Sequence, residues 1–345
     1  MRAEVSEGVG AVYRSRFRVG GVSVQLAGHC ETDVTLVPSL EPFRLETGES
    51  DIDIRVDRVR CLRASSGRKL FDSGTTWEVS ESAAGLQFDF NAALFGDMPF
   101  KRLLIDVHFR NATLQLNEEC LVDLSGEVEP LGYPLDELLI MHRLTQEKAI
   151  ELHGSGIVRG DGVGDLFVGH SGAGKSTTTR LWTECEDVEV LSDDRIIVRR
   201  DEISAHACEV ETRFHAGVAA REREVLRLRD RSASPSGHSA QDDKKKRMRM
   251  YGTPWHGEAM YASPNSAPLT RIFVLEHGRG NVISRLSPSQ AVAELFARSF
   301  VPFHRHEYVE SALEFLQELV DSVPVYRYAF EPDRRAVEKI CNFHD

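Results

Sequence analysis

The chain has 345 residues, of which 41% are hydrophobic and 28% are charged, and its formal net charge at pH 7 is −12. This length and composition are typical of a globular protein with two domains. The negative charge argues against nucleic acid and anionic membranes as partners, and no apolar run reaches the 18 residues of a spanning helix. The first residues lack the apolar core of a signal peptide, and the six cysteines form no C-x-x-C pair. We therefore expect a cytoplasmic protein with reduced thiols.

Residues 1–128 are predicted to form a β-rich domain. Short segments in which apolar and polar residues alternate recur there, separated by Gly, Ser, Asp and Pro, as in consecutive strands. No group of titratable residues stands out. The domain is therefore open to two interpretations, recognition of a substrate or partner and a purely structural role. The predicted strands lie within 21–29, 51–56, 75–82, 85–90 and 103–117.

Residues 129–345 show the mixed pattern of an α/β domain. Pro134, followed by two acids that complement a helix dipole, predicts a helix start, and Ser287 before Pro288 predicts another. Residues at about 203–249 contain too few apolar side chains to pack, which predicts a mobile insertion. Further helices and strands are expected within 150–160, 165–172, 188–202, 271–276, 308–323 and 325–330.

The segment from Gly169 to Ser176 fits the phosphate-loop pattern G-x-x-x-x-G-K-[ST]. It follows an apolar strand and precedes a helix start, a geometry that directs backbone N–H groups and a helix dipole at an anion. Lys175 would reach the terminal phosphates of ATP, and the Ser176 hydroxyl would bind Mg²⁺. The alternative is a turn whose glycines serve packing alone. The predicted phosphate- and nucleotide-binding residues are Gly169, His170, Ser171, Gly172, Ala173, Gly174, Lys175, Ser176 and Thr177.

Two adjacent acids, Asp193 and Asp194, follow an apolar strand about 18 residues after the phosphate-loop segment. One acid there can complete the Mg²⁺ shell, and a second can accept the proton of an attacking hydroxyl. An ordinary Asp-Asp turn is the alternative. His153 would lie near the loop if its strand forms a hairpin with the next strand. There it would tune the base through a charge-assisted hydrogen bond, or it would be structural.

The glycine- and proline-rich segment 252–258 supplies a further candidate. Glu258 would lie near the metal if this segment faces the phosphates. A structural turn with a packed Trp255 is the other interpretation, because loops carry both kinds of residue.

Residues 149–200 resemble the core of the HPr kinase/phosphorylase family. The shared order is Leu-His-Gly, two strands, a phosphate loop and an Asp-Asp pair followed by Arg, here in LHGSGIVRGDGVGDLFVGHSGAGKS and VLSDDRIIV. The resemblance implies the α/β fold shared with ATP-dependent phosphoenolpyruvate carboxykinase, a mixed sheet with a phosphate loop. It also implies a homo-oligomer, and catalysis by the Asp193/Asp194 pair with His153 and Lys175.

Two segments depart from that family. YGTPWHGE, residues 251–258, replaces a glycine-rich signature around an Arg-Gly dipeptide, and residues 1–128 do not match the family's N-terminal domain. GTPWHGE is similar instead to HPr kinase-like proteins found beside peptide-modifying enzymes, including kinases of lasso-peptide precursors. The expected acceptor is therefore a serine hydroxyl of a peptide or protein other than HPr, or a small hydroxyl compound.

The expected activity is ATP-dependent phosphotransfer to that hydroxyl, with Mg²⁺ held by Ser176, Asp193 and Asp194. Two alternatives stay open. One is a nucleotide-binding regulatory or assembly protein without transfer, and the other is a hydrolase whose acceptor is water. The sequence does not decide which aspartate is the base.

Overall fold

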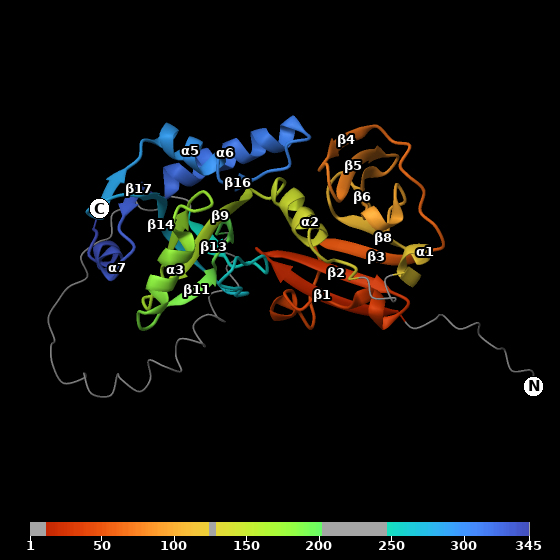
Figure 1. Cartoon of the computed structure of the whole chain (residues 1–345), viewed down its shortest axis with the longest axis horizontal. Coiled ribbons are helices and arrows are strands. Elements are labelled where there is room, and N and C mark those ends of the chain that lie inside the picture. The colour runs from red at the N-terminus through yellow and green to blue at the C-terminus, as the bar shows by residue number, and fades with distance from the viewer. Residues whose placement is uncertain (1–11, 124–128, 202–246, 345) are drawn as a thin grey trace, which may run out of the picture.

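The computed structural model describes residues 12–123, 129–201 and 247–344. Two β-sheets lie side by side along the long axis of the molecule, with helix α2 between them (Figure 1). The strands are β1 (Tyr13–Val19), β2 (Val22–Gly28), β3 (Ile52–Val59), β4 (Lys69–Asp72), β5 (Trp77–Ser82), β6 (Gly85–Phe90), β7 (Lys101–Asp106), β8 (Asn111–Asn117), β9 (Ala149–Val158), β10 (Gly164–Val168), β11 (Glu189–Ser192), β12 (Arg195–Arg200), β13 (Met248–Tyr251), β14 (Ser266–His277), β15 (Val282–Arg285), β16 (Ser299–Phe300) and β17 (Val325–Phe330). The α-helices are α1 (Glu118–Asp123), α2 (Leu135–Leu144), α3 (Lys175–Thr183), α5 (Pro288–Phe296), α6 (His306–Ser322) and α7 (Arg334–Cys341), and short 3-10 helices lie at Glu31–Val34, Glu41–Phe43 and Ala93–Phe95.

The first sheet confirms the β-rich character predicted for the N-terminal region. Within the described part of the chain its strand order is β1-β2-β3-β8-β7-β6-β5-β4. β3 runs parallel to both β2 and β8, and its Ile52, Ile54 and Val56 are buried while Asp53 and Arg55 are exposed. Because buried and exposed residues alternate along the strand, the buried side chains all point to one face of the sheet, toward a core. The apolar residues of α2 belong to the same core, so α2 covers that face.

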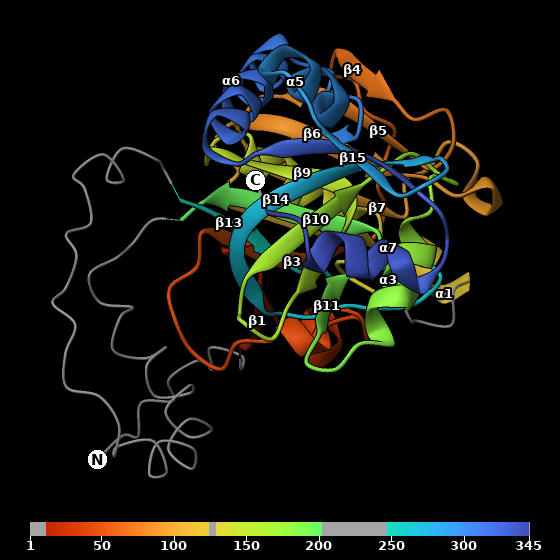
Figure 2. The same cartoon turned by 90° about the vertical axis from the view of Figure 1, so that its left-hand side faces the viewer.

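The second sheet is the middle layer of a three-layer α/β arrangement. Alternate residues of β10 point to opposite faces. Leu166 and Val168 pack in the core shared with α5 and α6, whereas Phe167 packs in the core shared with α3 and α7. Figure 2 shows these two helix pairs on either side of the sheet. The predicted helix start at Ser287 is confirmed, because Ser287 and Gln290 form a capping box.

The strands of this sheet are mixed in direction. β10 pairs antiparallel with β9, as the predicted hairpin requires, and parallel with β14, which in turn is parallel to β17. The carboxyl ends of β10, β14 and β17 therefore lie at one edge. Ligands of α/β sheets bind at such an edge, and the phosphate-loop segment leaves β10 there.

Strand β13 was not predicted. Its residues Met248 and Arg249 lie inside the range expected to be a mobile insertion, so the sheet resumes earlier than the sequence pattern indicated. The insertion itself falls on residues 202–246, outside the part of the chain that the structure describes, and stays a prediction.

The two sheets share one hydrophobic core at their junction. Ile197 of β12 and Trp255, both from the second half of the chain, pack with the N-terminal core. Arg199 donates a hydrogen bond to the Gly20 carbonyl at 2.8 Å, and Arg143 donates one to the His108 carbonyl at 2.9 Å. Within the described ranges, none of the helices combines the length and apolarity needed to cross a bilayer.

Candidate functional site

The predicted phosphate loop joins the buried strand β10 to α3. Gly172 and Gly174 have φ values of 79° and 101°, a backbone region that glycine adopts freely. A Cβ on Gly174 would also lie 2.4 Å from the Phe330 ring. Thr179 of α3 donates to the Lys175 carbonyl at 3.0 Å and lies 2.8 Å from the Ser155 hydroxyl of β9, which fixes the helix against the sheet. Glycine is therefore required at both positions by conformation, and at Gly174 also by close packing.

Lys175 folds back over the front of this loop. Its Nζ donates to the carbonyl oxygens of Gly169 at 3.0 Å and His170 at 3.3 Å, and the residue is only 7% exposed. Burial lowers the pKa of Lys175, while the Asp194 charge opposes that shift. Neutral backbone carbonyl oxygens thus bind the ammonium group, and phosphate oxygens could take their place as its hydrogen-bond partners.

Asp194 and His153 form a hydrogen-bonded pair beside the loop. Asp194 precedes β12, whose Arg195 lies opposite His153 of β9 in the strand register. Asp194 Oδ1 is 3.0 Å from His153 Nε2, and Oδ2 accepts from Arg195. Burial alone would raise the pKa of Asp194, but the His153 hydrogen bond and the charges of Arg195 and Lys175 hold it below its ordinary value. The carboxylate therefore stays ionised at neutral pH.

Asp193 has a different environment. It is 2% exposed, and its two oxygens accept hydrogen bonds of 3.0 Å each from the backbone N–H groups of Gly257 and Ala259. These bonds fix the segment that contains Glu258 against the aspartate pair. The two neighbouring aspartates thus have different partners. Asp193 binds the backbone of segment 257–259, and Asp194 binds His153.

Two acids in the first turn of α2 brace the two aspartates. Glu137 accepts from Arg195 Nε at 2.9 Å, and Arg195 in turn holds Asp194. Asp136 accepts from Trp255 Nε1 at 2.9 Å, and Trp255 begins the segment that binds Asp193. Sequence reasoning treated these acids as partners of the helix dipole alone. These two hydrogen bonds were not predicted from the sequence, because they join residues 58 and 119 positions apart.

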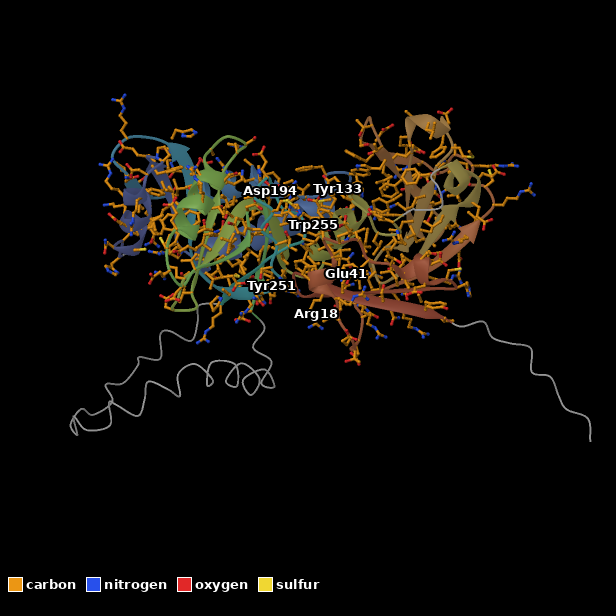
Figure 3. All side chains as sticks on the ribbon, turned by 60° about the horizontal axis from the view of Figure 1, so that its bottom comes forward. Arg18, Glu41, Tyr133, Asp194, Tyr251 and Trp255 are labelled. Carbon is orange, nitrogen blue, oxygen red and sulfur yellow. The ribbon has the colours of Figure 1, made fainter. Side chains whose placement is uncertain are left out.

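The hydrogen bonds of Glu137 and Asp136 lie at the junction of the two sheets, the region in which Figure 3 labels Trp255, Tyr133 and Asp194. Burial raises the pKa of Asp136 to about 6 and lowers that of Lys101, on β7 of the first sheet, to about 8. Burial, followed by the Glu137 charge, also raises the pKa of Glu151. The junction therefore contains buried titratable groups directly behind the aspartate pair.

One cavity of about 350 Å³ brings most of the predicted site residues together. Gly169, His170 and Ala173 belong to the loop but do not line this cavity. His277 also lines the cavity but was not among the predicted site residues. Its Nε2 lies 2.7 Å from the Gly172 carbonyl oxygen. His277 ends β14, so the rule that ligands bind at strand carboxyl ends could have found it. The lining residues are His153, Ser171, Gly172, Gly174, Lys175, Ser176, Thr177, Asp193, Asp194, Gly257, Glu258 and His277.

The cavity suits Mg²⁺ bound together with phosphates better than a metal ion alone. No cluster of three or more His, Cys, Asp or Glu side chains that could hold a metal occurs in the described ranges. Ser176 and the aspartate pair nevertheless line one cavity, and Mg²⁺ is commonly held by one or two protein oxygens together with phosphates and water. The donor set thus fits Mg²⁺ that arrives with a nucleotide.

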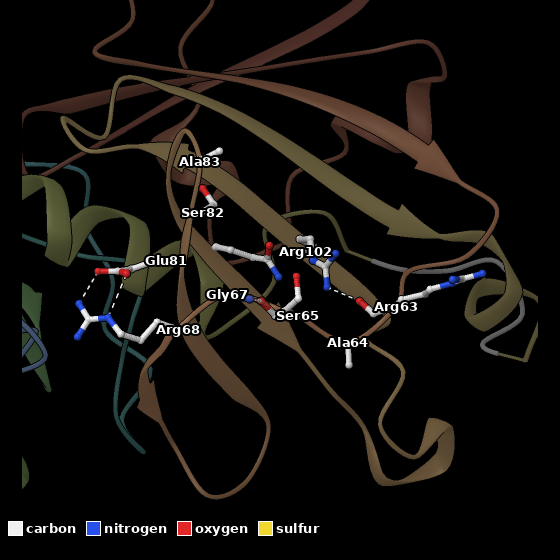
Figure 4. Close-up of a pocket in the computed structure, with 11 residues that line it drawn as sticks. Arg63, Ala64, Ser65, Gly67, Arg68, Glu81, Ser82, Ala83 and Arg102 are labelled. Carbon is white, nitrogen blue, oxygen red and sulfur yellow. Dashed lines mark hydrogen bonds and ion pairs between the residues drawn. The ribbon is translucent and has the colours of Figure 1, made fainter.

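A second hollow, of about 450 Å³, lies in the N-terminal sheet (Figure 4). Two of its three arginines, Arg68 and Arg102, are paired with acids. Arg68 binds Glu81 through two hydrogen bonds of 3.0 and 2.5 Å, and Arg102 binds Asp89 and the Arg63 carbonyl. Neither the phosphate-loop segment nor the aspartate pair contributes to this hollow.

Comparison with known proteins adds no assignment. Neither the models of protein families nor the curated proteins include a match to this chain. The class that the fold itself defines is a mixed α/β protein with a β-rich N-terminal region.

Proposed function

We propose that this chain is an ATP-dependent kinase with an HPr kinase-like core, which transfers the γ-phosphate to a serine hydroxyl of a peptide or protein. One observation carries the proposal: the phosphate-loop segment, the Asp194–His153 pair and Asp193 line a single cavity. A protein that only binds nucleotide needs the loop and one acid. The hydrogen-bonded Asp194–His153 pair supports transfer, because such a pair can take a proton. A small hydroxyl compound is the alternative acceptor.

The proposed reaction is an in-line displacement. The acceptor oxygen attacks the γ-phosphorus, the bond from that phosphorus to the β,γ-bridging oxygen breaks, and ADP leaves. Asp194 receives the hydroxyl proton, while His153 and Arg195 hold its two oxygens in place. Lys175 neutralises charge on the terminal phosphates once these replace its carbonyl partners.

Mg²⁺, when bound, adds positive charge at the β- and γ-phosphate oxygens. Ser176 and the two aspartates are the residues that would hold it, with Glu258 at the same cavity. The segment 257–259 is held at this cavity by its two hydrogen bonds to Asp193.

The test uses ATP labelled at the γ-phosphate, incubated with the full chain and Mg²⁺ in the presence and absence of serine-containing peptides. Label on a peptide, located on serine by mass spectrometry, is the expected result, and matched peptides with serine replaced by alanine serve as controls. Release of free phosphate alone would indicate a hydrolase. If the chain neither transfers nor releases phosphate, the proposal is overturned in favour of a nucleotide-binding regulator. Size-exclusion chromatography with light scattering tests the homo-oligomer that the resemblance implies.

A further inference from the structure

Arg298 lies beside the phosphate-loop segment and has no part in the mechanism above. It stands between α5 and β16 and is 8% exposed. Its Nη1 donates to the carbonyl and the carboxylate of Glu294, at 2.7 and 2.6 Å. Its Nε is buried and has no hydrogen-bond partner among the residues that the structure describes. A buried charged donor without an acceptor is costly. Arg16 and Arg159 also have a buried Nε without a hydrogen-bond partner in the described ranges, but of the three arginines Arg298 is the one that lines a cavity at the phosphate-loop segment.

A cavity of about 380 Å³ joins Arg298 to the front of the loop. Ser171, Gly172 and His277 line both this cavity and the one that contains the aspartate pair, so the two adjoin along the loop. The remaining lining residues are His170, Ala173, Val274, Leu275, Glu276, Glu294 and Arg298.

The position of Lys175 identifies which end of a nucleotide would lie there. In a phosphate loop the lysine reaches the β- and γ-phosphates. Lys175 itself lines the cavity of the aspartate pair, and its Nζ binds the carbonyls of Gly169 and His170, of which His170 lines the adjoining cavity of Arg298. The terminal phosphate is thus expected where the two cavities adjoin along the loop.

The guanidinium group is fixed in place. The Arg298 carbonyl accepts a 2.7 Å hydrogen bond from the N–H of His153, which connects it to the strand of the Asp194–His153 pair. Glu294, its carboxylate partner, is held from the other side by Arg327 at 2.9 Å. Besides burial, the charge of Arg298 contributes to lowering the pKa of Lys175, so the two cations are close enough to repel each other. A polyanion bound between them would relieve that repulsion.

We propose that Arg298 binds the terminal phosphate of the nucleotide and stabilises the charge that develops on it during transfer. This role rests on the proposed kinase function. As the bond to the bridging oxygen breaks and the bond to the acceptor oxygen forms, negative charge spreads over the γ-phosphate oxygens and the leaving oxygen. A fixed guanidinium group at that point lowers the barrier. Arg298 would supply within the chain what some phosphoryl-transfer enzymes receive from a partner's arginine.

The experiment compares Arg298→Gln with the wild-type chain by isothermal titration calorimetry, using Mg²⁺ with ADP and with the β,γ-imido analogue of ATP. Because ADP lacks the γ-phosphate, its dissociation constant should change less than about twofold. That of the ATP analogue should rise on the order of tenfold, and kcat should fall on the order of 10²–10³, as for loss of one transition-state donor.

Arg327→Gln is the matched control. Arg327 binds the same Glu294 carboxylate but does not line the cavity, so its removal should leave the ratio of the two dissociation constants unchanged. If Arg298→Gln does not fold, Arg298→Lys replaces it, since lysine keeps the charge for Glu294 but loses the planar fork. We expect this variant to retain ADP binding and to lose most of kcat.

The outcomes separate this role from the kinase function itself. An unchanged ratio of the two dissociation constants in Arg298→Gln, or a normal ratio and kcat in Arg298→Lys, overturns the role of Arg298 alone. A wild-type chain that binds neither nucleotide overturns the kinase function and this role together.

Discussion

The hollow in the N-terminal sheet and the cavity at the phosphate-loop segment differ in how their polar groups are satisfied. In the first, Arg68 and Arg102 are bound to the acids Glu81 and Asp89. In the second, the hydrogen-bond partners of Lys175 among the described residues are backbone carbonyls, and Asp194 and His153 line the same cavity. The N-terminal hollow is the larger of the two, yet the smaller cavity is the one equipped for an anion. The kind of polar group that meets in a cavity therefore identifies a phosphate site better than its volume does.

The two hollows also differ in how far apart their residues lie in sequence. The N-terminal hollow uses residues 63–102, all on adjoining strands and loops. The other cavity gathers side chains from residues 153 to 277. Bringing polar side chains together from distant segments costs conformational entropy and desolvation without a compensating gain in core packing. Function is the simpler explanation for that arrangement.

The largest effect is expected at Lys175. In Lys175→Ala, loss of the cation should weaken ATP binding more than tenfold and reduce phosphotransfer on the order of 10³-fold. The melting temperature should stay the same or rise, because burial lowers the pKa of Lys175 and its removal relieves a desolvation cost. Calorimetry and a thermal melt measure the two effects. Normal ATP binding by Lys175→Ala would show that the Lys175 cation is not needed. The proposed difference between the two hollows would then not hold.

The next largest effects are expected at the two aspartates, and they should differ in kind. Asp194→Asn removes the proposed base, so turnover should fall on the order of 10²–10⁴ while ATP binding changes only a few-fold. Asp193→Asn places an amide donor opposite the N–H groups of Gly257 and Ala259. It should cost about 1–3 kcal/mol in the free energy of unfolding as well as activity. Steady-state kinetics and urea unfolding test both, and normal turnover in both variants would contradict the mechanism.

These two aspartates show what the sequence could and could not predict. The strand, loop and helix around Lys175 follow from local patterns, as does the hairpin that brings His153 near the loop. The division of labour between Asp193 and Asp194 depends on which backbone N–H groups and side chains reach them. Those contacts come from residues 41 to 66 positions away. Tertiary packing sets such contacts, and no local periodicity records them.

The N-terminal sheet was predicted as β-rich but without its contribution to the site. Lys101 and Asp136 are buried at the junction, and Trp255 connects Asp136 to the segment that binds Asp193. In the sequence Trp255 could equally be a packed residue or part of a functional loop, and in the structure it is packed beside one. A buried polar contact between distant segments leaves no signal in composition or spacing.

A smaller effect, on stability, is expected from Asp136→Asn. The folded pKa of Asp136, about 6, exceeds the ordinary value of 3.8. The carboxyl group therefore stabilises the fold at pH below about 4, and this contribution is lost as the pH rises through 6. Asparagine keeps an oxygen for Trp255 but does not titrate. The free energy of unfolding of the variant relative to wild type should thus increase by about 2 kcal/mol from pH 4 to pH 7. Urea unfolding at both values measures it, and a constant difference would contradict burial of Asp136.

The smallest effect is expected in the N-terminal hollow, and it tests the comparison most directly. Arg68→Ala removes an exposed side chain whose ion pair with Glu81 should add little stability. The melting temperature, ATP binding and turnover should all stay close to wild type. A fall in kcat/KM for a peptide acceptor, with ATP binding unchanged, would instead show that the hollow binds the acceptor. The N-terminal domain would then be a recognition domain.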